Sequence, residues 1–209
     1  LGPETLKLVP IRNALLKRLV LIIQPAILLF ICALIGAATT DAAGTRSLIA
    51  EWAAGFAVAP NALAGAWRVA LLGILFGFSL FLFDRLTRPY WAPPGRGPDL
   101  ATDWKPSGFV AGLLYGGITE EIMMRWGIMN LVLWLLVRVT GAADGNPSLF
   151  LVWVAVAVSA LIFAAGHLPA ALAGGLRNRG FIVRTLGLNF VAGLMFGWLF
   201  WAWNRSEEH

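Results

Sequence analysis

Charged residues are scarce in this chain. Asp, Glu, Lys and Arg together make up 13% of the 209 residues, whereas hydrophobic residues make up 59%. This composition excludes an ordinary soluble domain, in which about 25% of residues are charged. Several apolar runs reach about 20 residues, roughly the length that a helix needs to cross the hydrocarbon core of a membrane. Because a lipid-facing β-barrel would show short alternating strands instead, the sequence predicts an all-α, polytopic transmembrane helical bundle.

Cysteine and clustered basic residues are also lacking. The single cysteine, Cys32, lies inside an apolar run, so neither a disulfide framework nor a thiolate metal cluster is available, and a packing role is expected. The 16 lysines and arginines give a net charge of +5 but do not form one patch. We therefore expect the lipid bilayer as a partner and no nucleic acid.

The apolar runs predict about five membrane spans. The third run could form one long helix or two short ones. One crossing leaves eleven basic residues on one side of the membrane and three on the other, whereas two crossings leave nine against five. The positive-inside rule favours the single crossing, with a cytoplasmic N-terminus. The predicted spans are then Leu19–Ala38, Ala62–Phe83, Ser107–Val139, Ser148–Gly166 and Leu186–Trp203.

Two stretches between the first spans are more polar. Charged residues interrupt Thr39–Asn61, for which an interfacial or re-entrant segment is predicted. Asp84–Lys105 contains the sequence RPYWAPPGRGPD, with four prolines and two glycines. This composition predicts a turn-rich polar loop at the membrane surface.

The sequence GGITEEIMMRWG, Gly116–Gly127, places two glutamates and an arginine inside an apolar run. Glu121 and Arg125 are four residues apart, so on a helix they share a face and can pair, which favours a supporting role. Glu120 points about 100° away, towards the side of the motif's glycines. It is therefore the carboxylate that remains free to act.

A second polar feature, FAAGH, ends with His167 on the next span. The two spans are joined by GAADGNP, Gly141–Pro147, which is rich in helix breakers and predicts a hairpin turn. The midpoint between Glu120 and His167 falls inside this turn, so both residues are expected at the same depth. A carboxylate and an imidazole at the same depth can hold a water molecule between them. Phe163, one helical turn before His167, is expected to pack against the imidazole ring.

Each feature also has a plainer interpretation. The Glu-Glu-Arg group could be a structural ion-pair lock, and His167 an interfacial histidine at a helix end. In NFVAGLMFGW, Asn189, Gly193 and Gly197 recur at four-residue intervals. That spacing predicts a small-residue packing seam, with Asn189 in a helix–helix hydrogen bond.

The patterns Glu-Glu-x-x-x-Arg and Phe-x-x-x-His on successive spans resemble the CPBP family of CAAX-protease and bacteriocin-processing intramembrane endopeptidases. This family includes the Ras-converting CAAX endopeptidase. The resemblance covers about Ser107 to Trp203. It implies hydrolysis of a peptide bond in a membrane-associated, prenylated (CAAX-type) or leader-peptide substrate. Glu120 would be the general base, His167 its partner on the water, and Glu121 with Arg125 the supporting pair.

The resemblance also implies whether a cofactor is needed and where in the cell the protein lies. On the preferred interpretation no cofactor is required, because the glutamate activates the water. Zn²⁺ is the alternative, although Glu120 and His167 alone supply too few ligands for it. A bacterial inner membrane is the expected location.

One departure from the family concerns the end of the chain. Family members continue into a helix with a second histidine, followed four residues later by an asparagine, which binds the substrate carbonyl or a metal. Here the remaining histidine is His209, and Arg205–His209 spells a translated sequencing adaptor. We therefore expect an N-terminal membrane region at 1–106, a catalytic core at 107–204 that is incomplete at its C-terminus, and a non-native tail at 205–209. Such a fragment could be inactive.

Two functions of other classes use the same residues. Buried Glu, His and Arg side chains could serve a proton-coupled transporter, and the same fold could be a non-catalytic membrane immunity or scaffold protein. A transporter of this kind usually shows a paired repeat, and the sequence shows none. The protease interpretation is therefore preferred.

Overall fold

The structure is a computed structural model that describes residues 14–46, 66–92, 115–173 and 178–204, together with Gly55 and Gly112. Within these ranges the chain is mainly helical and contains no β-strand element. One helix is continuous in space but changes its winding along its length, from η1 through η2 to α8. The elements are α2 (Ala14–Ala43), α5 (Ala66–Trp91), η1 (Tyr115–Thr119), η2 (Ile122–Met129), α8 (Asn130–Thr140), α9 (Leu149–Ala173) and α10 (Arg179–Asn204).

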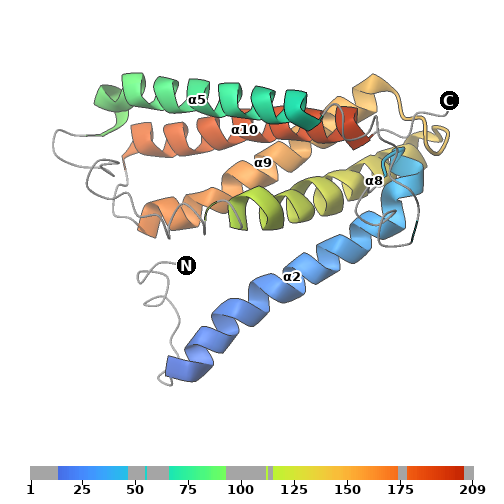
Figure 1. Cartoon of the computed structure of the whole chain (residues 1–209), viewed down its shortest axis with the longest axis horizontal. Coiled ribbons are helices and arrows are strands. Elements are labelled where there is room, and N and C mark those ends of the chain that lie inside the picture. The colour runs from blue at the N-terminus through green and yellow to red at the C-terminus, as the bar shows by residue number, and fades with distance from the viewer. Residues whose placement is uncertain are drawn as a thin grey trace.

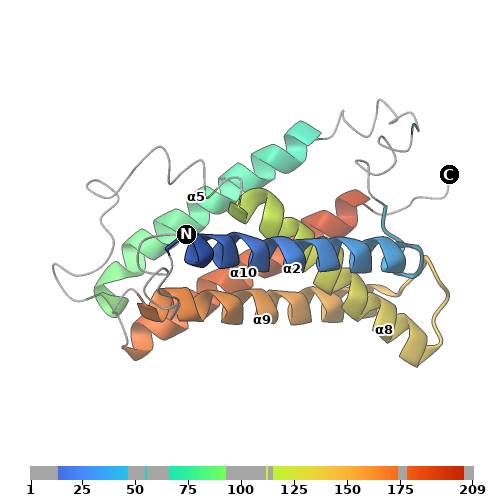
Figure 2. The same cartoon turned by 90° about the horizontal axis from the view of Figure 1, so that it is seen from below.

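Among the described residues, five helices are long and apolar enough to cross a membrane. This confirms the predicted all-α bundle of five spans, and the protein is an integral membrane protein. Figure 1 shows the helices in the order α5, α10, α9, α8 and α2 down the page, and α2 lies across the η2–α8 segment (Figure 2). The spans are Ile23–Ala43, Trp67–Trp91, Gly116–Thr140, Leu149–Ala173 and Arg179–Trp203.

The loop predicted from Asp84 onward is wrong for its first eight residues, because α5 continues to Trp91. Contacts with α10 hold this extension in place. Both carboxylate oxygens of Asp84 accept hydrogen bonds of 2.7 Å from the Arg184 guanidinium, and Trp91 is buried against Phe181. Tertiary pairing thus extends the helix through polar sequence. The rest of the predicted loop, 93–105, lies outside the described residues.

Other helix ends also extend beyond the predicted spans. Helix α9 continues past Gly166 to Ala173, and α10 begins at Arg179 rather than at Leu186. The first residues of the predicted interfacial segment, 39–43, belong to α2, where the Thr39 hydroxyl donates to the Ile35 carbonyl at 2.8 Å. Most of that segment, 47–54 and 56–61, lies outside the described residues. Apolar runs mark the membrane-crossing part of a helix but not its polar ends.

The packing seam between α9 and α10 depends on glycine. A β-carbon built at Gly193 would lie 2.7 Å from the Ala160 β-carbon, and one at Gly197 would lie 3.0 Å from Val156. Since lipid removes most of the hydrophobic drive between membrane helices, close backbone approach of this kind supplies the packing energy. The predicted seam is therefore confirmed at these two glycines.

The helix–helix hydrogen bond predicted for Asn189 is wrong. The Asn189 side-chain amide donates to the Thr185 carbonyl at 2.8 Å, one turn earlier in the same helix. A partly buried amide in an apolar helix can satisfy its donor locally in this way. Asn189 is therefore a local feature of α10.

A second close contact holds α2 against η2. A β-carbon at Gly127 would lie 2.6 Å from the Cys32 β-carbon, and Cys32 is buried, as expected for a packing role. The Trp126 indole covers Gly36 and donates its Nε1–H to the Ala33 carbonyl at 3.2 Å. Gly127 thus faces α2, which corrects the expectation that it shares the side of Glu120.

The chain reverses at the predicted turn between α8 and α9. Gly141 takes a left-handed conformation (φ 69°) and its N–H caps α8 at the Val137 carbonyl. The Gly145 N–H donates to the Ala42 carbonyl at 3.2 Å, which fixes this turn to the end of α2. The hairpin that positions the two polar motifs is therefore anchored at its closed end.

Candidate active site

The glutamate motif lies in a helix wound more widely than an α-helix. Tyr115–Thr119 and Ile122–Met129 form π-helical turns, and Glu120 and Glu121 lie at their junction. This part of the helix is packed on two sides, against α2 and against α9. π-helical turns are rare and frequently mark functional sites. The α-helical geometry assumed from the sequence is corrected here, and the wider turns allow Glu120 to face α9 while Gly127 faces α2.

Glu120 and His167 lie opposite each other across the hairpin. Glu120 Oε1 is 3.9 Å from His167 Nε2, and the two side chains are 24% and 35% exposed. This distance is too long for a direct hydrogen bond, but a single water molecule can contact both atoms. Beside them is a cavity of about 350 Å³, whose walls include Met123, Met124 and Ile162. The pair therefore borders a space that a substrate segment could enter.

The surroundings of His167 determine which ring nitrogen carries the proton in the neutral form. Nδ1 lies 2.8 Å from the Phe163 carbonyl oxygen, one helical turn earlier. Because a carbonyl can only accept, Nδ1 must be the donor, and Nε2 is then left as an acceptor towards Glu120. The Phe163 ring also contacts the imidazole edge-on at 4.4 Å. Phe163 thus fixes both the orientation and the tautomer of His167.

Glu121 and Arg125 form the ion pair that their spacing suggested. Glu121 Oε1 is 3.4 Å from Arg125 Nη1, and the side chains are 35% and 1% exposed. The guanidinium lies over the rings of Phe163 at 4.7 Å and Phe196 at 5.7 Å. Within the described residues its nitrogens make no hydrogen bond. One carboxylate and two aromatic faces therefore balance this buried cation.

Two contacts near the site were not anticipated from the sequence. The Ser159 hydroxyl of α9 donates to the Met124 carbonyl of η2 at 2.9 Å, and Phe196 of α10 closes the aromatic contact around Arg125. The hairpin reasoning that paired Glu120 with His167 could have found Ser159, since Met124 and Ser159 lie at similar depths. Nothing in the sequence singles out Phe196 among the 13 phenylalanines.

Metal ligation can be tested against the donor set. Within the described ranges, no group of three or more His, Cys, Asp or Glu side chains is arranged to hold a metal ion. Glu120 and His167 supply two donors, whereas a catalytic zinc site usually takes three protein ligands. The described residues alone therefore do not complete a zinc site.

Glu120 and His167 are partly buried and face each other on adjacent transmembrane helices, and the comparison with known families indicates an intramembrane protease fold. Residues 102–206, about half of the chain, match the family described as type II CAAX prenyl endopeptidase Rce1-like. The matched region contains the whole hairpin with both polar motifs. The chain belongs to this family, as the sequence patterns indicated. No curated protein and no solved structure matches it.

Proposed function

We propose that the protein is an intramembrane endopeptidase that hydrolyses a peptide bond in a membrane-associated substrate. Prenylated CAAX-type proteins and leader peptides are the candidate substrates. The observation that carries this proposal is the acceptor nitrogen of His167 facing Glu120 at 3.9 Å beside a cavity. Both groups can accept a hydrogen bond from one water molecule, which leaves the water's lone pair free for attack.

The proposed reaction begins with this water. Glu120 removes one proton as the water oxygen forms a bond to the carbonyl carbon of the scissile peptide. His167 Nε2 accepts a hydrogen bond from the other O–H of the water and so orients the water molecule. The protonated Glu120 then delivers its proton to the amide nitrogen as the C–N bond breaks. The products are a carboxylic acid and an amine, and Glu120 returns to its starting state.

The supporting residues act through position. Phe163 holds His167 by its carbonyl and its ring, and the Arg125 guanidinium lies over the Phe163 ring. Glu121 balances the Arg125 charge, so the pair keeps the helix register that directs Glu120 at α9. We assign Glu121 and Arg125 this positioning role. The proposal gives no catalytic role to Asn189.

The reaction as proposed needs no cofactor. The alternative is a Zn²⁺ ion held by Glu120 and His167 with a further ligand from outside the described residues. The ion would then polarise the water. Activity that persists after exhaustive chelation supports the glutamate mechanism, whereas loss of activity that zinc restores supports the alternative.

The proposed orientation places the N-terminus in the cytoplasm, in a bacterial inner membrane. The support is the asymmetry of basic residues between the two sides, eleven against three. In this orientation Glu120 and His167 lie towards the cytoplasmic side of the bundle. A cytoplasmic substrate segment anchored in the membrane could reach them there.

The test is cleavage of a farnesylated CAAX peptide and of a membrane-tethered leader peptide in proteoliposomes. The enzyme is used in a form that includes any natural sequence beyond His209. Glu120→Gln and His167→Gln are each expected to lower turnover by about 10²–10⁴-fold, the usual contribution of acid–base groups. Asp144→Asn is the matched control, because it removes a carboxylate from an ion pair at the surface turn, where Asp144 is 50% exposed.

The possible outcomes separate the functions. Unchanged turnover in both site variants would refute the proposed mechanism. Saturable peptide binding without cleavage by the unaltered protein would favour the immunity or scaffold function. Proton uptake coupled to solute transport in the same vesicles would favour a transporter.

A further inference from the structure

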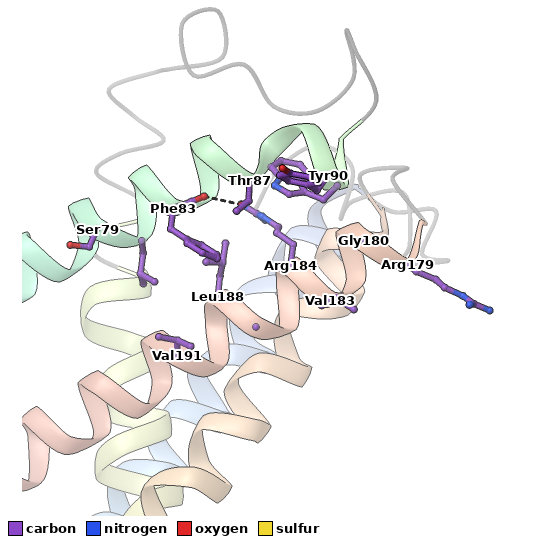
Figure 3. Close-up of a pocket in the computed structure, with 13 residues that line it drawn as sticks. Ser79, Phe83, Thr87, Tyr90, Arg179, Gly180, Val183, Arg184, Leu188 and Val191 are labelled. Carbon is purple, nitrogen blue, oxygen red and sulfur yellow. Dashed lines mark hydrogen bonds between the residues drawn. The ribbon is translucent and has the colours of Figure 1, made fainter.

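A second and larger cavity lies outside the candidate active site, between α5 and α10. Its volume is about 930 Å³, within the range of ligand pockets, which is about 300–1,000 Å³. Figure 3 shows Phe83, Leu188 and Val191 pointing into the space between the two helices. The walls are mainly apolar side chains, so the cavity suits a hydrocarbon occupant.

Helices α5 and α10 contact each other at both ends of the cavity. At one end, a β-carbon built at Gly180 would lie 2.9 Å from the Tyr90 carbonyl, and the Asn178 side-chain amide donates to the Trp91 carbonyl at 3.0 Å. At the other end, the rings of Phe76 and Phe196 meet edge-on at 6.2 Å. The two helices therefore touch above and below a stretch in which they stand apart.

The length of that stretch matches one lipid leaflet. The α5 wall runs from Ser79 to Trp91, which corresponds to about 18 Å at about 1.5 Å per residue. The hydrocarbon core of a bilayer is about 30 Å thick and holds two layers of acyl chains, so one chain extends about 15 Å. A transmembrane helix from a second copy or another protein would need the full thickness. The cavity dimensions therefore favour an acyl chain over a helix.

The cavity opens sideways at the membrane-facing surface. Val183 and Val191 line it and are 69% and 43% exposed. Gly187 leaves room between them, because a β-carbon there would meet nothing within 4 Å. An acyl chain could therefore enter from the lipid without separating the helices.

Positive charge is concentrated at one end of this cavity. Arg179 and Arg184 line the cavity there, and the carboxylate of Asp84 accepts a hydrogen bond of 2.7 Å from Arg184. The exposed Arg179 side chain extends away from the cavity in Figure 3. Two further arginines, Arg85 and Arg88, lie in the same part of α5. Excess positive charge beside an apolar groove favours an anionic headgroup over a neutral one.

We propose that the cavity between α5 and α10 binds an anionic phospholipid, with an acyl chain along Phe83, Gly187 and Val191 and the phosphate near Arg179. The site is separate from Glu120 and His167 and does not depend on the proposed protease activity. A bound lipid would fill the space between the two helices and tie α5 to the rest of the bundle.

The test uses the chain reconstituted in vesicles of equal phosphatidylglycerol and phosphatidylcholine, then extracted in a mild detergent. Retained phospholipid is counted by native mass spectrometry. The unaltered protein is expected to retain phosphatidylglycerol in preference to phosphatidylcholine. Gly187→Leu is expected to lower phosphatidylglycerol affinity about tenfold, because the new side chain displaces about two methylene groups of the acyl chain. Arg179→Ala is expected to lower the preference for phosphatidylglycerol about fivefold.

Gly77→Leu is the matched control. It adds the same side chain to α5 at another glycine where a β-carbon meets nothing within 4 Å, and Gly77 does not line the cavity. Val191→Phe fills the groove from another position in case Gly187→Leu does not fold, as judged by far-ultraviolet circular dichroism.

Three results would overturn the proposal. The first is equal retention of the two phospholipids by the unaltered protein. The second is unchanged retention in the folded groove-filling variants. The third is a change in oligomeric state, rather than in lipid retention, when Gly187 is replaced, which would make the groove an interface between copies. Lower retention in Gly187→Leu or Val191→Phe, with normal retention in Gly77→Leu, supports it.

Discussion

The ion pair between Glu121 and Arg125 should respond very differently to the loss of each partner. Arg125 is 1% exposed, whereas Glu121 is 35% exposed. Glu121→Gln therefore leaves a buried cation that water cannot reach. Arg125→Met leaves a carboxylate that can still be hydrated, and the thioether can pack against Phe163 in place of the guanidinium. We expect the conservative-looking glutamine to be the more damaging substitution.

The magnitudes follow from the burial of each group. Removing one partner of a fully buried pair costs about 3–5 kcal/mol. The aromatic faces of Phe163 and Phe196 remain against Arg125, so the loss of Glu121 should cost about 3 kcal/mol. Arg125→Met should cost about 1 kcal/mol, since pairs open to solvent contribute at most about that amount. The double variant should return to within about 1 kcal/mol of the unaltered protein, because neither charge is then left unpaired.

The assay is reversible unfolding in mixed micelles, followed by far-ultraviolet circular dichroism, for both single variants and the double variant. Peptide turnover is measured in parallel, and it should fall in both single variants if the pair positions Glu120. Equal losses of stability in the two single variants would refute the argument from burial. An additive double variant would show that the two charges do not interact.

Two further substitutions test the packing around the hairpin. Ser159→Ala should lower the free energy of unfolding by about 0.6 kcal/mol, the average for a hydrogen bond between membrane helices, and by about 1.7 kcal/mol at most, because it removes the bond to η2. Ser79→Ala, whose hydroxyl bonds within its own exposed helix, should change the free energy of unfolding by less than half as much. Gly193→Leu should lower the free energy of unfolding by about 1–3 kcal/mol through overpacking, since even a β-carbon there would lie 2.7 Å from the Ala160 β-carbon. Thermal unfolding measures the effect of both the Ser159 and the Gly193 substitutions. A Gly193→Leu protein that is as stable as the Gly77→Leu protein would contradict the close contact.

The meeting of Glu120 and His167 could be predicted from the sequence because it depends on only two quantities. The position of the turn at Gly141–Pro147 fixes where the hairpin reverses, and the steady rise of a helix fixes depth. A small error in the winding of the helix changes the depth of a residue in the membrane only slightly. The predicted equal depth of Glu120 and His167 therefore holds despite the π-helical turns. In the structure, Glu120 Oε1 lies 3.9 Å from His167 Nε2.

Direction around a helix axis is less tolerant of such errors. Each residue adds about 100° in an α-helix, so wider turns between Glu120 and Gly127 are enough to move the glycine to the α2 side. Asn189 illustrates a second limit, because a polar side chain in an apolar helix can bond to a neighbouring helix or to its own backbone. The sequence contains nothing that distinguishes these two outcomes. Contacts with Arg184 on α10 likewise decide where α5 ends.

The π-helical turns around the glutamates make the chemistry depend on the number of residues in the helix. Removing one residue between Glu120 and Trp126, with the wider winding kept, would shift one side of the helix by one residue relative to the other. The polypeptide would stay apolar, helical and long enough to cross the membrane. The indole covering Gly36 and the carboxylate facing His167, however, would be turned about 100° relative to each other. A single deletion could therefore preserve insertion into the bilayer while separating the anchoring face of the helix from its reactive face.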